Sequence, residues 1–82
     1  MTNSPGQTLY LQRVDPERNM ARFYVLALQP TLFGEVSLIR NWGRIGTGGQ
    51  TKVETFPTSR DVTAAYGRIE RSKRRRGYGE PR

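Results

Sequence analysis

The chain has 82 residues, which allows one domain with a small core, because a chain of this length buries only roughly 60% of the surface that its unfolded form exposes. It contains neither cysteine nor histidine, which excludes disulfides, thiolate or imidazole metal sites and the commonest general base, so we expect no metal, no cofactor and no enzymatic activity. Fourteen basic residues against seven acidic ones give a formal charge of +7, and 12 of the 14 are arginine, which favours a phosphate-bearing partner over a merely solubilising role.

The domain organisation expected from the chain is simple. We expect a folded domain over residues 9–78 between flexible ends at 1–8 and 79–82. No apolar run approaches the ~18 residues of a membrane span, and the first residues lack the pattern of a secretion signal. We therefore expect a cytoplasmic monomer that has no membrane partner, and that is associated with the nucleoid if it binds DNA.

Four short runs have the length and the aromatic and β-branched composition of strands, at residues 9–14, 22–28, 35–42 and 50–56. Asp15, Pro16 and Asn19 indicate a turn after the first strand, because proline presets φ and asparagine tolerates a left-handed backbone. Residues 43–50 hold four glycines and are expected to form a loop before the last strand.

A helix is expected after the strands. Thr58 can cap its first turn, and Asp61 lies favourably near its positive end. A stripe of apolar side chains with helical spacing should pack on the sheet: Val62, Ala65, Tyr66 and Ile69. Gly67 suggests a close approach to a strand, and Gly77 ends the helix. The predicted fold class is α+β, a single small domain with a mainly antiparallel sheet of about four strands and one helix from the C-terminal half packed on it.

The most distinctive string is residues 41–47, NWGRIGT, in which Trp42 and Arg44 flank Gly43. Such a segment can present an indole face that stacks on a sugar or base and a guanidinium that reaches a phosphate. The alternative is that Trp42 belongs to the core and Arg44 is a solvated charge.

With this string the chain resembles the WGR domain family, which occurs in DNA-dependent poly(ADP-ribose) polymerases and as small bacterial proteins. The namesake Trp42-Gly43-Arg44 extends as RNWGRIGTGGQ over residues 40–50. Further matching elements surround it: Asn19, the aromatic run 22–26, Lys52, Phe56 and Gly77-Tyr78. The resemblance covers nearly the whole chain and rests on several elements in family-like order and spacing.

The resemblance implies contact with DNA at strand breaks, with Trp42 stacked on the sugar of a terminal nucleotide. In the polymerases the motif arginine serves contacts between domains, so Arg44 here either binds phosphate, docks a separate partner protein or holds the loop. Lys52 and Arg40 would contact phosphate. Gly43 and Gly46 would shape the motif loop. The polymerases' zinc and catalytic segments are not found in this sequence, so we expect no ADP-ribosyl transfer.

Other functional interpretations of the same segment are weaker. Gly48-Gly49-Gln50 matches the tripeptide by which peptide-chain release factors promote hydrolysis, but a hairpin already accounts for the glycines and the rest of the chain resembles no release factor. A phosphate-binding loop ends in a lysine followed by serine or threonine, and a helix begins there. Residues 43–49 have neither feature. The acidic residues show no metal-ligand spacing, so we predict neither a catalytic nor a metal site.

The second candidate site is the basic stretch 68–82, which holds seven basic and two acidic residues. Its proposed phosphate contacts are Arg68, Arg71, Arg74, Arg75 and Arg76. Such contacts would position a nucleic acid without reading its sequence. The alternative is a solvated helix end whose charge complements the helix dipole.

Together these patterns predict a non-enzymatic module that binds nucleic acid, most directly DNA at ends, nicks or gaps, as in DNA-damage recognition. RNA is an alternative ligand, because single strands offer the same sugars and stacking faces. An alternative of another class is a protein-protein adaptor that docks a partner through the WGR loop and Arg44, with the basic tail incidental.

Overall fold

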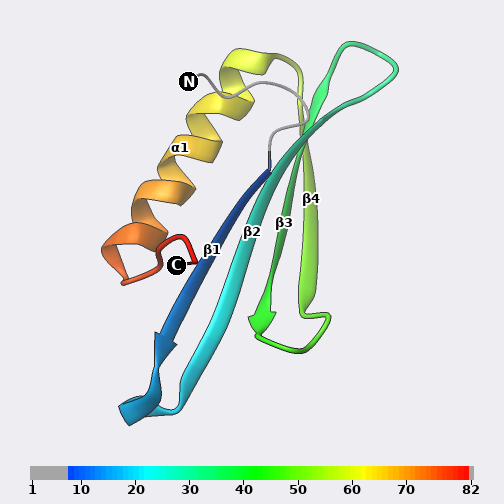
Figure 1. Ribbon diagram of the computed structural model, residues 1–82. Coiled ribbons are helices and arrows are strands. Elements are labelled where there is room, and N and C mark those ends of the chain that lie inside the picture. The colour runs from blue at the N-terminus through cyan, green and yellow to red at the C-terminus, as the bar shows by residue number, and fades with distance from the viewer. Residues whose placement is uncertain (1–7, 82) are drawn as a thin grey trace.

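The computed structural model describes residues 8–81. Its elements, in chain order, are β1 (Thr8–Asp15), the short 3-10 helix η1 (Pro16–Arg18), β2 (Met20–Pro30), β3 (Val36–Arg44), β4 (Gln50–Phe56) and α1 (Ser59–Arg75). The strands form one antiparallel sheet in the order β1-β2-β3-β4. Figure 1 shows α1 running along one face of this sheet. The predicted α+β fold is therefore confirmed.

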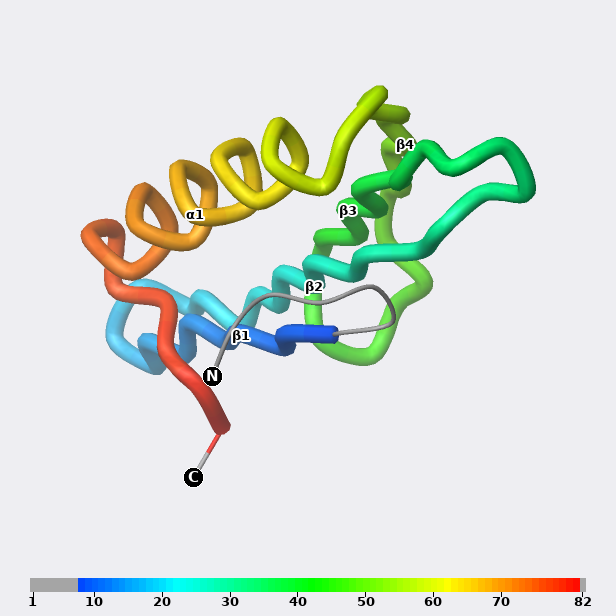
Figure 2. The backbone as a smooth tube through the Cα atoms, turned by 90° about the horizontal axis from the view of Figure 1, so that it is seen from above, coloured from blue at the N-terminus to red at the C-terminus, as the bar shows by residue number. Residues whose placement is uncertain are grey.

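The core lies between α1 and one face of the sheet. Figure 2 shows the helix running over that face. The largest fully buried side chains come from β1, β2, β3 and α1: Leu11, Leu26, Leu38, Val62 and Tyr66. Strand parity selects the first three and helical spacing selects the last two. The expected stripe of α1 is thus the one that packs on the sheet, with Ile69 partly buried beside it.

The strand β3 is longer than the sequence pattern predicts. It continues through Trp42, Gly43 and Arg44, which were expected at and beyond the strand end. The reason is that β2 is long enough to supply partners: Trp42 pairs with Tyr24 and Gly43 with Phe23. The Trp-Gly-Arg string therefore lies on a regular strand, and strand register fixes which way its side chains point.

Two details of the turns and the helix follow from local chemistry. Asn19 adopts a left-handed backbone with φ 54°, as the turn prediction requires. Thr58 caps α1, since its Oγ1 accepts a hydrogen bond from the Asp61 amide at 3.1 Å. The expected approach of Gly67 to a strand is wrong, because a side chain built there would meet the guanidinium of Arg71 on the same helix.

Where the structure describes it, the C-terminal segment contacts β1 and α1. Gly79 exchanges two backbone hydrogen bonds with Gln12 of β1, at 2.7 and 2.9 Å. Glu80 accepts a hydrogen bond from Arg74 at 2.8 Å. Residues 1–7 and Arg82 lie outside the described residues, so the flexible N-terminus stays a prediction. Across residues 8–81, no helix is both long and apolar enough to cross a membrane.

Candidate nucleic-acid interface

Trp42 projects from β3 on the sheet face that α1 covers, near the C-terminal end of the helix. Its indole stacks on the Tyr24 ring of the neighbouring strand, with centroids 5.9 Å apart and an interplanar angle of 18°. Tyr78 then meets Tyr24 edge to face at 6.3 Å. The sequence alone leaves open whether Trp42 belongs to the core or to a binding surface. Trp42 is partly buried: one part of its side chain packs against the core, and another part is accessible.

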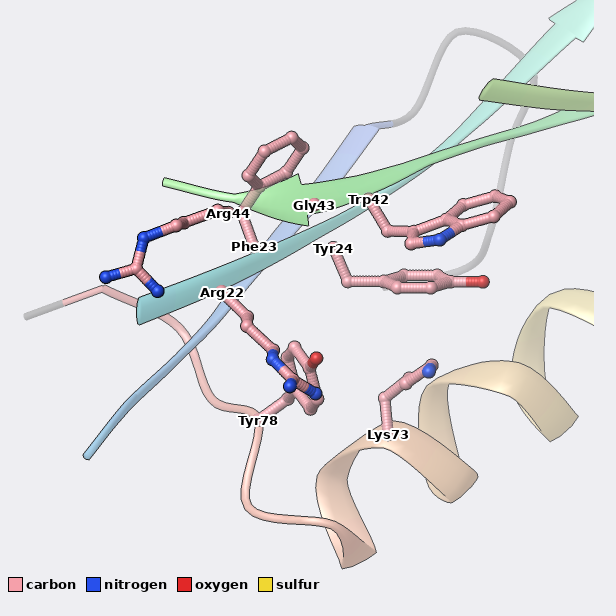
Figure 3. Close-up of a pocket in the computed structure, with 8 residues that line it drawn as sticks. All are labelled: Arg22, Phe23, Tyr24, Trp42, Gly43, Arg44, Lys73 and Tyr78. Carbon is pink, nitrogen blue, oxygen red and sulfur yellow. The ribbon is translucent and has the colours of Figure 1, made fainter. Parts of the chain in front are cut away.

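These rings border a cavity of about 430 Å³, drawn in Figure 3. Its lining comes from β2, β3, the last turn of α1 and the segment after it: Arg22, Phe23, Tyr24, Trp42, Gly43, Arg44, Lys73 and Tyr78. Three of these residues are cationic and four are aromatic. Among the described residues, no carboxylate contributes to the lining. Such a lining suits an anionic ligand that also has a flat or apolar part.

The cations at this end of the sheet follow from strand register. Arg22 pairs with Arg13 on one side and with Arg44 on the other, so three arginines cross β1, β2 and β3 in a row. Paired residues share a face of the sheet, and Arg22 lies two positions before Tyr24, so the row is on the same face as Trp42. Within residues 8–81, neither Arg13 nor Arg22 has a carboxylate partner.

Lys73 closes the cavity from the helix side. Its Nζ lies 4.5 Å from the centroid of the Tyr24 ring and 5.4 Å from that of Tyr78. Burial lowers the pKa of this amine, and repulsion from Arg76, Arg40 and Arg22 lowers it further. The cavity is thus a concentrated positive site even before a ligand arrives.

Arg44 is exposed but not free. Its guanidinium donates to the backbone oxygen of Asn19 at 3.4 Å and to the Asn19 side-chain oxygen at 3.5 Å. These bonds join the end of β3 to the turn between β1 and β2. Of the three roles considered for this arginine, the contacts give direct support to holding a loop, and the position beside the cavity is compatible with phosphate contact.

Close contacts and positive φ values explain why glycine occurs at several positions of the β3–β4 hairpin. A Cβ on Gly43 would lie 2.8 Å from the Gly49 Cα, so the two glycines allow the strand end and the loop to touch. Gly46 and Gly49 have positive φ values of 96° and 69°, which favour glycine. Asn41 fixes the loop from the opposite face of the sheet, with Nδ2 donating to the carbonyl oxygens of Gly48 and Gln50, both at 3.0 Å.

Comparison with known proteins agrees with this geometry. A sequence model described as the WGR domain matches residues 7–82. The chain belongs to the WGR domain family. WGR domains are binding modules rather than catalytic domains, and they usually bind nucleic acid in proteins that resemble poly(ADP-ribose) polymerases.

One relative is the uncharacterized protein y4dW of Sinorhizobium fredii (strain NBRC 101917 / NGR234), which is 49% identical over 70 residues. The match covers 85% of this chain and 34% of that protein, so the chain spans about a third of the relative's length. No solved structure matches the chain.

β3 also carries Arg40, for which we expected a phosphate contact. Its side chain is only 21% exposed and forms an ion pair with Glu54 at 3.3 Å. Lys52 is its register partner on β4, is exposed, and has no carboxylate partner among the described residues. The structure therefore makes Lys52 the more accessible of these two predicted cations, and Arg40 a half-buried one.

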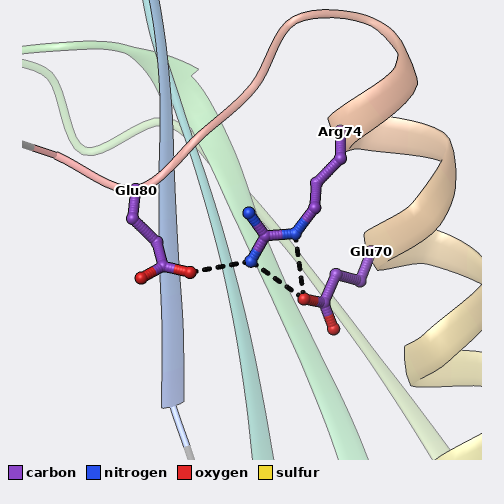
Figure 4. A network of polar contacts seen from close by, with 3 residues as sticks. All are labelled: Glu70, Arg74 and Glu80. Carbon is purple, nitrogen blue, oxygen red and sulfur yellow. Dashed lines mark hydrogen bonds and ion pairs between the residues drawn. The ribbon is translucent and has the colours of Figure 1, made fainter.

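The five helix arginines do not form one equivalent set. Arg74 bridges two carboxylates, as Figure 4 shows: its Nη2 lies 2.9 Å from Glu70 and 2.8 Å from Glu80. These bonds raise its pKa, with the Glu80 hydrogen bond as the largest cause. By contrast, four exposed arginines have no ion pair within residues 8–81: Arg68, Arg71, Arg75 and Arg76. Arg74 thus connects α1 with the C-terminal segment, while the others remain available to a phosphate backbone.

Sequence reasoning missed five of the residues that line the cavity: Arg22, Phe23, Tyr24, Lys73 and Tyr78. A signal for two of them was present, because Arg22 and Tyr24 share the parity of the buried Leu26 and therefore face the helix side. Lys73 and Tyr78 could not be found in this way. Their positions depend on where α1 stops and how the chain turns back, with the Tyr78 amide bonded to the Lys73 carbonyl at 3.1 Å.

Proposed function

We propose that this WGR domain binds DNA at ends, nicks or gaps, using Trp42 for the exposed terminal sugar and the surrounding cations for phosphate. The observation that carries the proposal is the cavity in which Trp42, Tyr24 and Tyr78 lie beside Arg22 and Lys73 without a lining carboxylate. An aromatic surface can stack only on a group that a duplex leaves uncovered, and a break uncovers a sugar and a base face. The cations supply contacts that position the strand without reading its sequence.

The two basic surfaces have different roles in this proposal. The cavity cations contact the phosphates next to the break, because they surround the stacking platform. Arg75 and Arg76 extend the positive surface from the end of α1, and Arg76 is close enough to Lys73 to affect its pKa. Lys52 adds an exposed charge on β4. Binding should therefore combine a specific stacking contact with a general electrostatic one.

The test is fluorescence anisotropy with a duplex that carries one nick, with the same duplex closed and intact, and with a single strand. We expect Trp42→Ala to weaken binding to the nick on the order of tenfold, the usual value of a stacking contact, with much less effect on the intact duplex. The matched control is Tyr10→Ala, because Tyr10 is an aromatic residue on the opposite sheet face, stacked on Phe23. Equal losses on nicked and intact DNA would contradict recognition of breaks, and preference for the single strand would favour RNA or unpaired DNA.

Protein docking is the second candidate function. The observation that favours it is the β2–β3 turn, where Leu32 and Phe33 are 97% and 86% exposed. Two large exposed apolar side chains at a turn tip form a patch of the kind that a partner surface can cover. Capture from a nuclease-treated lysate distinguishes the candidates: a stoichiometric partner that is lost in Leu32→Ala/Phe33→Ala, or in Arg44→Ala, supports docking, whereas loss of all partners after nuclease treatment contradicts it.

A further inference from the structure

The amine of Lys73 is placed unusually for a lysine of a basic protein. It lies in the last turn of α1 and projects toward the Tyr24 ring, in the cavity that Trp42 also lines (Figure 3). Most lysine side chains extend into water, where the ammonium ion is fully hydrated. Here the amine is held over one ring and near a second, at 4.5 and 5.4 Å from their centroids.

No carboxylate keeps this amine protonated. The ion pairs among residues 8–81 all involve arginine, and Glu70, the acidic residue nearest along the helix, is bonded to Arg74. The charged groups that face Lys73 are Arg22 from β2, Arg40 from β3 and Arg76 from the helix end, with the phenols of Tyr24 and Tyr78 beside them. The two rings attract the ammonium form, but burial and these arginines lower the pKa of the amine, so a larger fraction of it is neutral and nucleophilic than for a solvated lysine.

We propose that Lys73 is a nucleophile for aldehydes, and that its substrate is the ring-opened deoxyribose 5-phosphate left at a break by an abasic residue. The inference rests on the proposed function, which puts the terminal sugar at Trp42. An abasic sugar lacks the base, so its ring-opened form has a free C1′ aldehyde that can react with an amine lining the cavity, as Lys73 does. Its phosphate suits the cations Arg22 and Arg44, which line the same cavity.

The proposed reaction requires neither an oxidant nor a metal. The neutral amine attacks the C1′ aldehyde carbon, a C–N bond forms, and the carbonyl oxygen takes a proton to give a carbinolamine. A proton from solvent then converts the carbinolamine hydroxyl into water, which leaves as the C–O bond breaks and gives a protonated imine. This cation acidifies the C2′ hydrogen, whose transfer to solvent water allows the C3′–O bond to break, with the 3′ phosphate of the DNA leaving with the electron pair. Hydrolysis of the imine returns the Lys73 amine.

The experiment uses the full chain and a nicked duplex whose 5′ terminus at the nick is a deoxyribose 5-phosphate, with cyanoborohydride to reduce the imine to a stable amine. The adduct is measured on a denaturing gel and mapped by peptide mass. We expect wild-type protein to form an adduct at Lys73, and Lys73→Arg, which keeps the charge, to reduce its yield at least about tenfold because arginine is not a nucleophile at neutral pH. Arg60→Lys is the matched control: it adds an exposed lysine on α1 outside the cavity and should change neither the yield nor the mapped position.

Binding of each protein to the unmodified nicked duplex is measured in parallel, and circular dichroism verifies the fold of each variant. Binding without an adduct, an adduct mapped to Lys52 or to the terminal amine, or an unchanged yield in Lys73→Arg would each overturn the inference while leaving the proposed function intact. A wild-type protein that does not bind the nicked duplex would overturn the proposed function and this inference with it.

Discussion

At the scale of single residues, Arg74 shows that a basic side chain in a basic stretch can have a structural role. Its guanidinium joins Glu70 of the helix to Glu80 of the C-terminal segment, and Tyr78 of the cavity wall lies between them in the chain. We expect Arg74→Ala to lower the free energy of unfolding by about 1 kcal/mol, as for a small network of exposed ion pairs. Arg75→Ala removes a charge without an ion pair in residues 8–81 and should change stability by less than about 0.5 kcal/mol.

The same pair of variants separates positioning from phosphate contact. Arg74→Ala should weaken binding to a nick by loosening the Tyr78 wall, and it should leave the salt dependence of binding unchanged. Arg75→Ala should flatten the plot of log affinity against log salt by about 1, the change expected for one lost phosphate contact. Urea unfolding and anisotropy at several salt concentrations measure both effects. A flatter slope in Arg74→Ala would show that this arginine contacts phosphate after all.

At the scale of elements, the β3–β4 hairpin positions the indole through its loop glycines. A Cβ on Gly49 would overlap the Trp42 carbonyl oxygen and lie 2.9 Å from Phe23 Cζ, at a φ of 69°. We expect Gly49→Ala to lower the free energy of unfolding by at least about 2 kcal/mol, because left-handed strain and a backbone clash add together. Thermal unfolding followed by circular dichroism measures this loss.

Gly48 supplies the control for that prediction within the same loop. A side chain there meets no atom within 4 Å, and its φ is not in the left-handed region. Gly48→Ala should therefore leave the unfolding temperature close to that of the wild type. Equal effects of the two substitutions would mean that the loop relaxes freely and does not fix Trp42.

The elements themselves were largely predictable from the sequence, because alternation and helical spacing are local properties. In β1 and β3, one strand parity carries the buried residues Leu11, Val36 and Leu38, a pattern that alternation alone indicates. What local patterns could not supply is pairing across the sheet. The row of Arg13, Arg22 and Arg44 exists only because of the register of two hairpins. The contacts of Glu80 with Arg74 and of Gly79 with Gln12 likewise join residues whose proximity depends on the finished fold.

At the scale of the whole molecule, part of the +7 charge is gathered at one stacking platform, because three cations line the same cavity as Trp42: Arg22, Arg44 and Lys73. Cations that have no ion pair within residues 8–81 come from both layers, with Arg22 in the sheet and Lys73, Arg75 and Arg76 at the helix end. If these neutralise about four phosphates, the plot of log affinity for duplex DNA against log salt should have a slope of about −3.5.

The stacking contact carries no ionic charge, so it adds affinity without adding to that slope. We therefore expect the ratio of affinities for nicked and intact duplex to stay nearly constant as salt rises, while both affinities fall. Anisotropy titrations of the two duplexes over a range of salt concentrations measure the ratio directly. A ratio that collapses toward one at high salt would show that the preference for breaks is itself electrostatic, and it would assign break recognition to the arginines in place of Trp42.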